Sequence, residues 1–314
     1  MTVPFRGVTH REALLLRGPA GWGEFSPFLE YDDAESSRWL AAALEAAHTG
    51  WPRPVRSAVP VNATVPAVPA DQVPSVLARF PGCTTAKVKV AQAGQVLADD
   101  VDRVSAVREA LGSSGKVRID ANAAWSVDEA LSAVVALAPY DLEYVEQPCA
   151  SVEELAALRL ALARSGLDVR VAADESIRKA QDPLRVALAG AADVVVLKVA
   201  PLGGVSAALE VALACGLPVV VSSALDTSVG ISAGVALAAA LPELPFACGL
   251  ATTSLMAADV VRASLNGRGG SIPVGAVEPD PDLLAELAAP PERQQWWRDR
   301  LGRCAALLDR SLEG

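Results

Sequence analysis

Seven polar residues and one glycine end a series of short apolar runs along this 314-residue chain, and the charged members could support proton chemistry at a metal site. In sequence order they are Asn62, Lys89, Asp120, Glu146, Asp174, Lys198, Ser223 and Gly249. By subtraction of these positions, successive members are 24 to 31 residues apart, about the length of a strand, a turn and a crossover helix. Seven such steps predict eight strands, enough to close a (β/α) barrel whose chemistry lies at the carboxyl ends of the strands. The order lysine, aspartate, glutamate, aspartate, lysine therefore indicates a metal site with oxygen ligands, placed between two amines.

Three carboxylates, Asp120, Glu146 and Asp174, close three consecutive predicted strands. Each of them could instead be the N-cap of a helix. Together they would repel one another at one barrel mouth unless a cation lay between them. Hard oxygen ligands without nitrogen or sulfur favour Mg²⁺ or Mn²⁺ over zinc, so we predict an Mg²⁺ site with Mn²⁺ as the alternative. Glu175 follows Asp174 directly and is expected to face the other way.

Lys87 and Lys89 are two residues apart on a predicted strand, so both side chains face the same way. An isolated Lys-x-Lys usually marks a solvated face, but here apolar residues flank both lysines. A lysine inside a barrel mouth, near another cation, has a lowered pKa and can act as a base. Lys198 follows four apolar residues and would lie about half a turn around an eight-stranded barrel from Lys89. The structural alternative for Lys198 is a buried ion pair.

Further polar residues are expected at the same barrel mouth. Arg118 and Asn122 share a strand face with Asp120, and Arg118 could orient an acidic ligand or grip a substrate carboxylate. Ser222 and Ser223 offer hydroxyl donors at the seventh strand, although alone they could be only an N-cap.

The elements that must position these residues fall into three segments. Residues 1–56 form a small unit with a predicted strand near 13–16 and a helix near 33–48. Residues 57–277 form the predicted barrel, and residues 278–314 form a final segment with a helix near 294–312 that packs back on the cap or barrel. The barrel strands are expected at 58–65, 86–90, 117–120, 142–146, 169–173, 194–199, 218–222 and 245–249. Outer helices are expected between them, as at 96–111 and 127–137.

Composition excludes several other functions. The net charge is −10 and no basic run exceeds a pair, so nucleic acid is a poor partner. The apolar runs are far shorter than a membrane span, and no apolar segment follows the N-terminus as in a secretory signal. Five dispersed cysteines indicate reduced thiols and a cytoplasmic location, and two histidines outside the series argue against zinc. The sequence carries no signal for an oligomeric state.

Five motifs resemble the muconate-lactonizing subgroup of the enolase superfamily. They are Lys87-x-Lys89, Arg118-Ile119-Asp120-Ala121-Asn122, Glu146-Gln147-Pro148, Asp174-Glu175-Ser176 and Lys198. The resemblance implies an α/β fold, a modified TIM barrel of (β/α)₇β type, capped by a small α+β domain from both chain ends. It implies that the three carboxylates bind Mg²⁺, which holds the carboxylate of a small-molecule substrate.

The resemblance also implies roles for the lysines. Lys89 would remove the proton alpha to that carboxylate, giving a metal-stabilised enediolate, and would then protonate a leaving hydroxyl in a syn-dehydration. Lys198 would be a stabilising cation across the ring, and Lys87 would tune Lys89.

Two further stretches, 222–228 and 23–28, are similar to those of superfamily members that make an aromatic ring in this way during menaquinone biosynthesis. The second stretch would close over the substrate and exclude water. On this resemblance Phe25, Ser26 and Gly249 are expected to join Arg118, Asn122, Ser222 and Ser223 in binding substrate.

Two other functions stay open at this point. Lysines on opposite faces of a substrate suit 1,1-proton transfer equally well, as in an N-succinylamino acid racemase or a dipeptide epimerase. A barrel that has lost catalysis and serves as a scaffold is a third function, because fold alone does not fix activity. The full set of charged residues argues against that third function.

Overall fold

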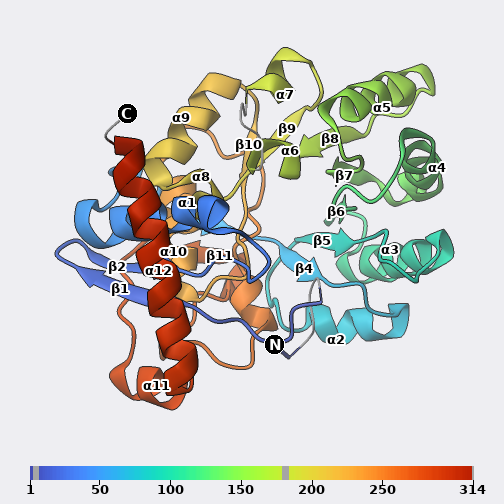
Figure 1. Ribbon diagram of the computed structural model, residues 1–314. Helices are drawn as coiled ribbons and strands as arrows, with labels where there is room; N and C mark the ends of the chain where they lie inside the picture. The colour runs from blue at the N-terminus through green and yellow to red at the C-terminus, as the bar shows by residue number, and fades with distance from the viewer. Residues whose placement is uncertain (3–6, 179–183, 313–314) are drawn as a thin grey trace.

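The computed structural model describes residues 1–2, 7–178 and 184–312 and shows a parallel barrel under a cap (Figure 1). Seven parallel strands form one curved sheet in the order β10-β9-β8-β7-β6-β5-β4. In chain order they are β4 (Ala63–Val65), β5 (Thr85–Lys89), β6 (Lys116–Asp120), β7 (Leu142–Glu146), β8 (Arg170–Ala173), β9 (Val194–Leu197) and β10 (Val219–Val221). The order follows the chain without exception, which confirms the predicted barrel topology.

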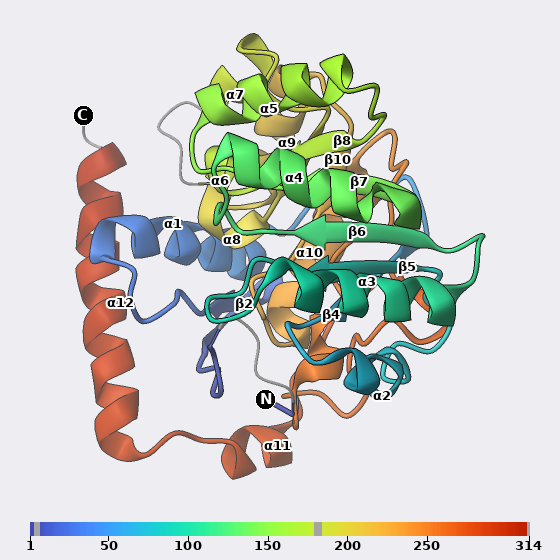
Figure 2. The same ribbon diagram turned by 90° about the vertical axis from the view of Figure 1, so that its right-hand side faces the viewer.

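Helices cover the outer face of this sheet, so its strands are buried on both sides (Figure 2). They are α2 (Val73–Leu77), α3 (Leu97–Leu111), α4 (Val127–Leu137), α5 (Val152–Arg164), α7 (Arg185–Leu188), α9 (Val205–Cys215) and α10 (Ser228–Ala240). Two further short helices, α6 (Glu175–Arg178) and α8 (Val199–Leu202), follow β8 and β9 at the carboxyl ends of those strands, and α8 packs against the cap. Short 3-10 turns lie at Ala70–Gln72, Ala138–Tyr140, Thr252–Leu255 and Arg268–Gly270. Capping boxes begin two of the helices: Ser126 pairs with Glu129 at α4, and Ser151 pairs with Glu154 at α5. Burial on both faces explains why a strand such as β9 is a continuous apolar run.

The barrel closes differently from the prediction at its two ends. No regular strand forms at residues 245–249, and two isolated parallel bridges, Val61 with Cys248 and Ser222 with Gly249, join that segment to its neighbours. The strand predicted at 58–65 is divided into β3 (Ala58–Pro60) and β4. β3 pairs antiparallel with β11 (Ser271–Pro273) outside the barrel sheet. Pro60 has no amide hydrogen to donate, which is consistent with the ladder changing there.

A cap built from both ends of the chain covers the carboxyl ends of the strands. Its N-terminal part is the hairpin of β1 (Leu14–Gly18) and β2 (Gly21–Phe25), followed by α1 (Asp33–Leu44), which continues as a π-helical turn over Glu45–Thr49. Its C-terminal part is α11 (Pro281–Glu286) and α12 (Pro291–Leu312), and α12 lies beside α1 in both views (Figures 1 and 2). The proposed boundaries at residues 56 and 277 stay predictions.

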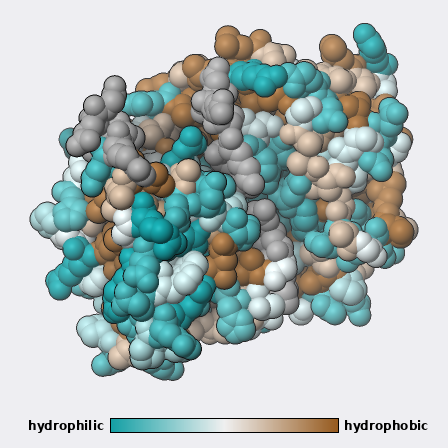
Figure 3. All heavy atoms as spheres, viewed as in Figure 1, coloured by the Kyte–Doolittle hydropathy of each residue, from teal (hydrophilic) through white to brown (hydrophobic). Residues whose placement is uncertain are grey.

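Three contacts show how tightly the cap is assembled. Gly23 of β2 lies against the backbone of α1, where a Cβ would be 2.0 Å from the carbonyl oxygen of Ala43. Arg300 of α12 is buried and donates hydrogen bonds to the carbonyl oxygens of Phe28 and Tyr31, at 3.0 and 2.6 Å. Trp297 meets Phe25 edge to face, with 5.8 Å between ring centroids. The outer face of α12 is hydrophilic, as the lower left of Figure 3 shows. In the described residues, no helix is both long and apolar enough to cross a membrane.

Candidate active site

Three of the predicted site residues are direct neighbours on adjacent strands. Lys89 of β5 is the register partner of Asp120 of β6, and Asp120 is the partner of Glu146 of β7. Asp174 directly follows β8, and Lys198 directly follows β9. All five side chains are buried, none more than 8% exposed. The carboxyl ends of five consecutive strands therefore bring the predicted charged series together in one buried group.

Two lysines form ion pairs with the carboxylates of this group. The Nζ of Lys87 lies 2.8 Å from Oε1 of Glu146 and 3.6 Å from Oδ2 of Asp120. On the opposite side, the Nζ of Lys198 pairs with Oδ2 of Asp174. Burial lowers the pKa of Lys87, but the charges of Glu146 and Asp120 outweigh burial and raise that pKa above its ordinary value. The lowered pKa predicted for a lysine in this position is therefore wrong for Lys87, whose charged form is favoured by these two carboxylates.

Lys89 is connected to the acidic group through Asn122. Its Nζ donates a hydrogen bond of 2.5 Å to Oδ1 of Asn122. The Nδ2 of Asn122 in turn donates to Oδ2 of Asp120 at 3.3 Å and to Oε1 of Glu175 at 3.4 Å. The prediction that Glu175 faces away from the site is thus wrong. Glu175 begins helix α6, so the alternation of a strand no longer governs its direction.

Asp120, Glu146 and Asp174 fit a hard divalent cation by their chemistry. All three supply oxygen donors, and their negative charges lie close enough for Asp120 and Asp174 to act on Glu146. Burial raises the pKa of Glu146 to about 7, with Asp120 and Asp174 adding to the rise while Lys87 opposes it. Oε2 of Glu146 is buried and has no hydrogen-bond partner in the described part of the chain. Within those same residues, no three acidic, histidine or cysteine side chains already stand in a metal-binding arrangement, and the two lysines pair with all three carboxylates instead.

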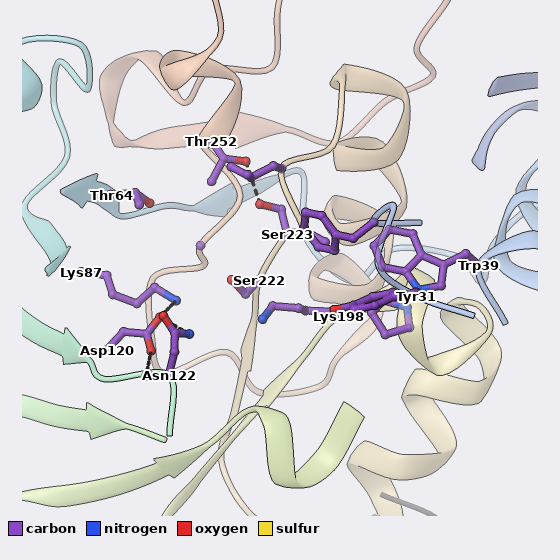
Figure 4. A pocket seen from close by; sticks show the side chains of 15 residues that line it. Tyr31, Trp39, Thr64, Lys87, Asp120, Asn122, Lys198, Ser222, Ser223 and Thr252 are labelled. Atoms are coloured by element: carbon purple, nitrogen blue, oxygen red, sulfur yellow. Dashed lines mark hydrogen bonds and ion pairs between the residues drawn. The ribbon is translucent and has the colours of Figure 1, made fainter. Parts of the chain in front are cut away.

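A cavity of about 40 Å³ lies between this group and the cap (Figure 4). The cap contributes an aromatic wall of Phe28, Tyr31 and Trp39. The barrel contributes Thr64, Lys87, Asp120, Asn122, Lys198, Pro201, Ser222, Ser223, Ala224, Leu225, Gly249 and Thr252. In Figure 4 the side chains of Lys87, Asp120 and Asn122 lie at one end of the cavity and Lys198, Tyr31 and Trp39 at the other.

The structure brings Ser222, Ser223 and Gly249 to this cavity, as the sequence predicted. Oγ of Ser223 is 2.7 Å from Oγ1 of Thr252, so these two hydroxyls form one hydrogen-bonded pair in the wall. Gly249 allows Ser222 to approach closely, because a Cβ at that position would lie 2.6 Å from Oγ of Ser222. A glycine is therefore needed where the two segments that close the barrel meet.

Arg118 is not brought to the cavity, although it shares a strand with Asp120. It is fully buried inside the barrel, where it donates to Oε2 of Glu143 at 2.5 Å and to the carbonyl oxygen of Ala247 at 2.6 Å. Its guanidinium lies 4.8 Å from the ring centroid of Tyr144. These contacts hold Arg118 beneath the site, and it does not line the cavity at which a substrate contact was predicted for it.

Phe25 and Ser26 also do not line the cavity. Phe25 packs in the cap core against Trp297, and Ser26 is buried at the joint between cap and barrel. From the same predicted loop Phe28 does reach the cavity, together with Tyr31 beyond it.

At the first strand, Asn62 is buried and Thr64 lines the cavity instead, because β4 continues to residue 65. Asn62 and Thr64 are two residues apart and share a strand face, so the end of β4 at Val65 is the signal that would have placed Thr64 at the mouth.

A second buried charged group joins the cap to the barrel next to this cavity. Glu24 of β2 accepts hydrogen bonds from the backbone amides of Thr227 and Gly230, at 3.1 and 2.9 Å, in the first turn of α10. Burial raises the pKa of Glu24 to about 7, and the neighbouring Asp226 adds to the rise while Arg11 opposes it. Burial raises the pKa of Asp226 as well.

The raised pKa of Glu24 predicts a pH-dependent stability. Between its ordinary value of 4.5 and about 7, the folded chain holds this proton more tightly than the unfolded chain. The Glu24 contribution to the free energy of unfolding therefore falls as pH rises through that window. Thermal melts of the parent and the Glu24→Gln variant at pH 5 and pH 8 test this. The melting temperature of the variant relative to the parent should rise by roughly 5 °C between the two pH values. The exposed Glu243→Gln is the matched control, and a constant difference for Glu24→Gln would contradict the prediction.

Comparisons with known proteins agree with this geometry. A family model described as "Enolase C-terminal domain-like" matches residues 72–281, and one described as "Enolase N-terminal domain-like" matches residues 1–47. Muconate lactonizing enzyme from Pseudomonas putida has the same fold, with a TM-score of 0.72 at 20% identity over 88% of this chain and 93% of that one. A dipeptide epimerase from Enterococcus faecalis V583 shares the fold with a TM-score of 0.68 at 23% identity, over 82% of this chain and 86% of that one. The chain belongs to the enolase superfamily, whose members depend on a divalent metal.

Much closer relatives are known by sequence. The o-succinylbenzoate synthase of Mycolicibacterium smegmatis is 58% identical over 98% of this chain and 94% of its own length. That of Thermobifida fusca is 59% identical over 96% of this chain and 92% of its own. Within the superfamily, the chain therefore belongs to the o-succinylbenzoate synthase family of lyases.

Proposed function

We propose that this chain carries out the syn-dehydration of 2-succinyl-6-hydroxy-2,4-cyclohexadiene-1-carboxylate to 2-succinylbenzoate in menaquinone biosynthesis, with Mg²⁺ as its cofactor. The observation that best supports this proposal is a buried row of three residues in register on adjacent strands, Lys89, Asp120 and Glu146. Lys198 faces this row and pairs with Asp174. The names of relatives at 58 and 59% identity over nearly the full chain support the same reaction. The five cysteines are free, which favours a reducing, cytoplasmic location.

In this proposal the carboxylates and lysines divide the work. Asp120, Glu146 and Asp174 would hold Mg²⁺, since their oxygen donors suit it and Oε2 of Glu146 lacks a hydrogen-bond partner in the described residues. When bound, Mg²⁺ would supply positive charge that offsets the charge developing on the substrate carboxylate. Lys87, held as a cation by Glu146 and Asp120, would stay protonated and add positive charge near Lys89.

Lys89 is the proposed acid and base. Its Nζ would take the proton alpha to the substrate carboxylate, leaving an enediolate, and would return that proton to the departing hydroxyl. Both transfers occur on one face of the ring, so a single amine is sufficient for a syn elimination. Asn122 orients the Nζ through its 2.5 Å hydrogen bond. Lys198 would face the other side of the ring as a stabilising cation, and Ser222 and Ser223 would contact the substrate from the seventh strand.

The aromatic wall of the cap would keep water away during these steps. Phe28, Tyr31 and Trp39 close the cavity to about 40 Å³, which is well below the roughly 300 Å³ at which small-molecule sites begin. We therefore infer that the loop between β2 and α1, which carries Phe28 and Tyr31, moves outward to admit the substrate and then returns over it.

The test is ultraviolet-monitored turnover of the cyclohexadiene carboxylate by purified protein, first with Mg²⁺ and then with EDTA. Fast formation of the aromatic product that EDTA stops and added Mg²⁺ restores is the expected result. No turnover by protein that binds Mn²⁺ would overturn the proposed reaction. Exchange of the alpha hydrogen of N-succinyl amino acids in D₂O would then point to racemisation. The dipeptide epimerase shares only the fold with this chain and does not favour that alternative.

A further inference from the structure

One arginine outside the charged group connects the two walls of the cavity. Arg11 precedes β1 in the cap, and its guanidinium crosses to the barrel loop that follows β10. Nε donates to the carbonyl oxygen of Leu225 at 3.2 Å, and Nη2 donates to that of Ala224 at 3.3 Å. Nη2 also donates to the carbonyl oxygen of Ser26 and lies 3.3 Å from its Oγ. A single side chain therefore holds a cap loop and a barrel loop together.

Both of the walls that Arg11 joins face the cavity. Ala224 and Leu225 line it from the barrel. From the cap, Phe28 lines it, and the Arg11 guanidinium lies 4.4 Å from the centre of the Phe28 ring, within the range of a cation–π contact. The Trp39 ring, also in the lining, is 5.9 Å away. Arg11 itself does not touch the cavity, so it can act only through these neighbours.

The barrel loop held by Arg11 has a backbone that needs support. Leu225 has a φ of 62°, in the left-handed region, where the Cβ of a leucine crowds its own backbone. Its carbonyl oxygen accepts the hydrogen bond from Nε of Arg11, and on its other side Oδ2 of Asp226 accepts one from the amide of Ala224 at 2.9 Å. The position of Leu225 in the wall thus depends on groups outside the cavity.

We propose that Arg11 is a positioning residue for substrate recognition, which sets the distance between the aromatic wall of the cap and the loop Ala224–Leu225. The part of the substrate that these walls contact lies away from the acidic group, so it is the succinyl side chain and the ring face, not the carboxylate next to the reacting carbon. This inference rests on the proposed function for its substrate. It assigns Arg11 to binding of that substrate and not to the proton transfers.

The planar fork of an arginine is what this geometry uses. Nε and Nη2 point in fixed directions and donate to three carbonyl oxygens on two loops. A lysine keeps the positive charge next to Glu24 and Asp226, which lie close enough to affect the pKa of Arg11, but its single ammonium cannot span both loops. Arg11→Lys therefore separates the positioning role from simple charge balance in the buried group.

Steady-state kinetics of Arg11→Lys with the cyclohexadiene carboxylate and saturating Mg²⁺ test the proposal. The KM is expected to rise about tenfold while kcat changes by less than about threefold, because Lys89 and the carboxylates are untouched. A residue that only stabilises the fold would lower the melting temperature and the amount of active enzyme but leave KM unchanged. Arg17→Lys is the matched control, since Arg17 is exposed on β1 and stacks on Trp22 at 5.5 Å.

A second measurement keeps this test separate from the proposed reaction. Binding of the product 2-succinylbenzoate, followed by tryptophan fluorescence because Trp39 lines the cavity, should weaken about tenfold in Arg11→Lys and not in Arg17→Lys. If the parent protein turns over the substrate and Arg11→Lys shows the parent KM and product affinity, the inference about Arg11 is overturned alone. If Arg17→Lys shows the same loss as Arg11→Lys, it is also overturned. If the parent neither turns over the substrate nor binds the product, the proposed function fails first.

Discussion

Replacing Lys89 by alanine is expected to lower kcat for dehydration by at least about 10³-fold, because one amine is proposed to serve as both base and acid, each worth roughly 10²–10⁴. Lys89 is 8% exposed and is the register partner of Asp120, so its loss removes the amine while Asp120 and Glu146 stay in place. Ultraviolet-monitored turnover at saturating Mg²⁺ gives kcat, and a thermal melt reports whether the fold is retained.

Lys116→Ala is the control for this experiment. Lys116 begins the neighbouring strand β6 and is exposed, at the opposite end from the charged group. It should leave kcat unchanged. Turnover by Lys89→Ala within about tenfold of the parent would show that another group, with Lys87 the nearest lysine on the same strand, moves the proton.

The Glu146→Gln variant should lose turnover to a similar extent, and for a different reason. The amide keeps the size of the side chain but removes the charge from the proposed central metal ligand. Binding of Mn²⁺, measured by electron paramagnetic resonance, should weaken at least about tenfold, since even outer partners of metal ligands contribute 10- to 100-fold. A thermal melt without added metal reports the loss of the buried ion pair between Glu146 and Lys87 separately from the loss of Mn²⁺ affinity.

Glu153→Gln is the matched control, because Glu153 is exposed on α5 and pairs with Arg185, and neither residue lines the cavity. Its Mn²⁺ affinity and kcat should equal those of the parent. Unchanged Mn²⁺ affinity in Glu146→Gln would remove Glu146 from the proposed ligand set, whatever the effect on turnover.

The strand order and the charged series could be predicted from sequence because both depend on local patterns. A strand covered on both faces reads as an apolar run, and the residue that ends it marks the barrel mouth. The closing segment 245–249 shows the limit of this signal. It is as apolar as a strand, yet it makes only two isolated bridges, one with Val61 and one with Ser222.

Residue alternation was also insufficient to separate the cavity from the barrel interior. Arg118 and Asp120 share a strand face, but the guanidinium turns toward Glu143 and the Tyr144 ring below the site. No pattern within β6 contains that information, since both partners belong to the next strand.

The cap side of the cavity was the least predictable part. The loop 23–28 was expected to present Phe25 and Ser26, whereas Phe28 and Tyr31 form the wall. Which of these aromatic residues faces the barrel is decided by α12, because Trp297 takes Phe25 into the cap core. Contacts between segments more than 250 positions apart leave no local trace in the sequence.

Helix α12 holds the N-terminal part of the cap in place through hydrogen bonds. This arrangement has a consequence for folding during synthesis on the ribosome. Arg300 anchors the carbonyl oxygens of Phe28 and Tyr31, and Glu12 accepts hydrogen bonds from Arg293 and from Trp297. Residues 12–31 therefore cannot make these contacts until residues 293–300 have been translated. A nascent chain would complete its barrel while the aromatic wall of the cap still lacked this anchor, so that wall would be fixed only after α12 had been made.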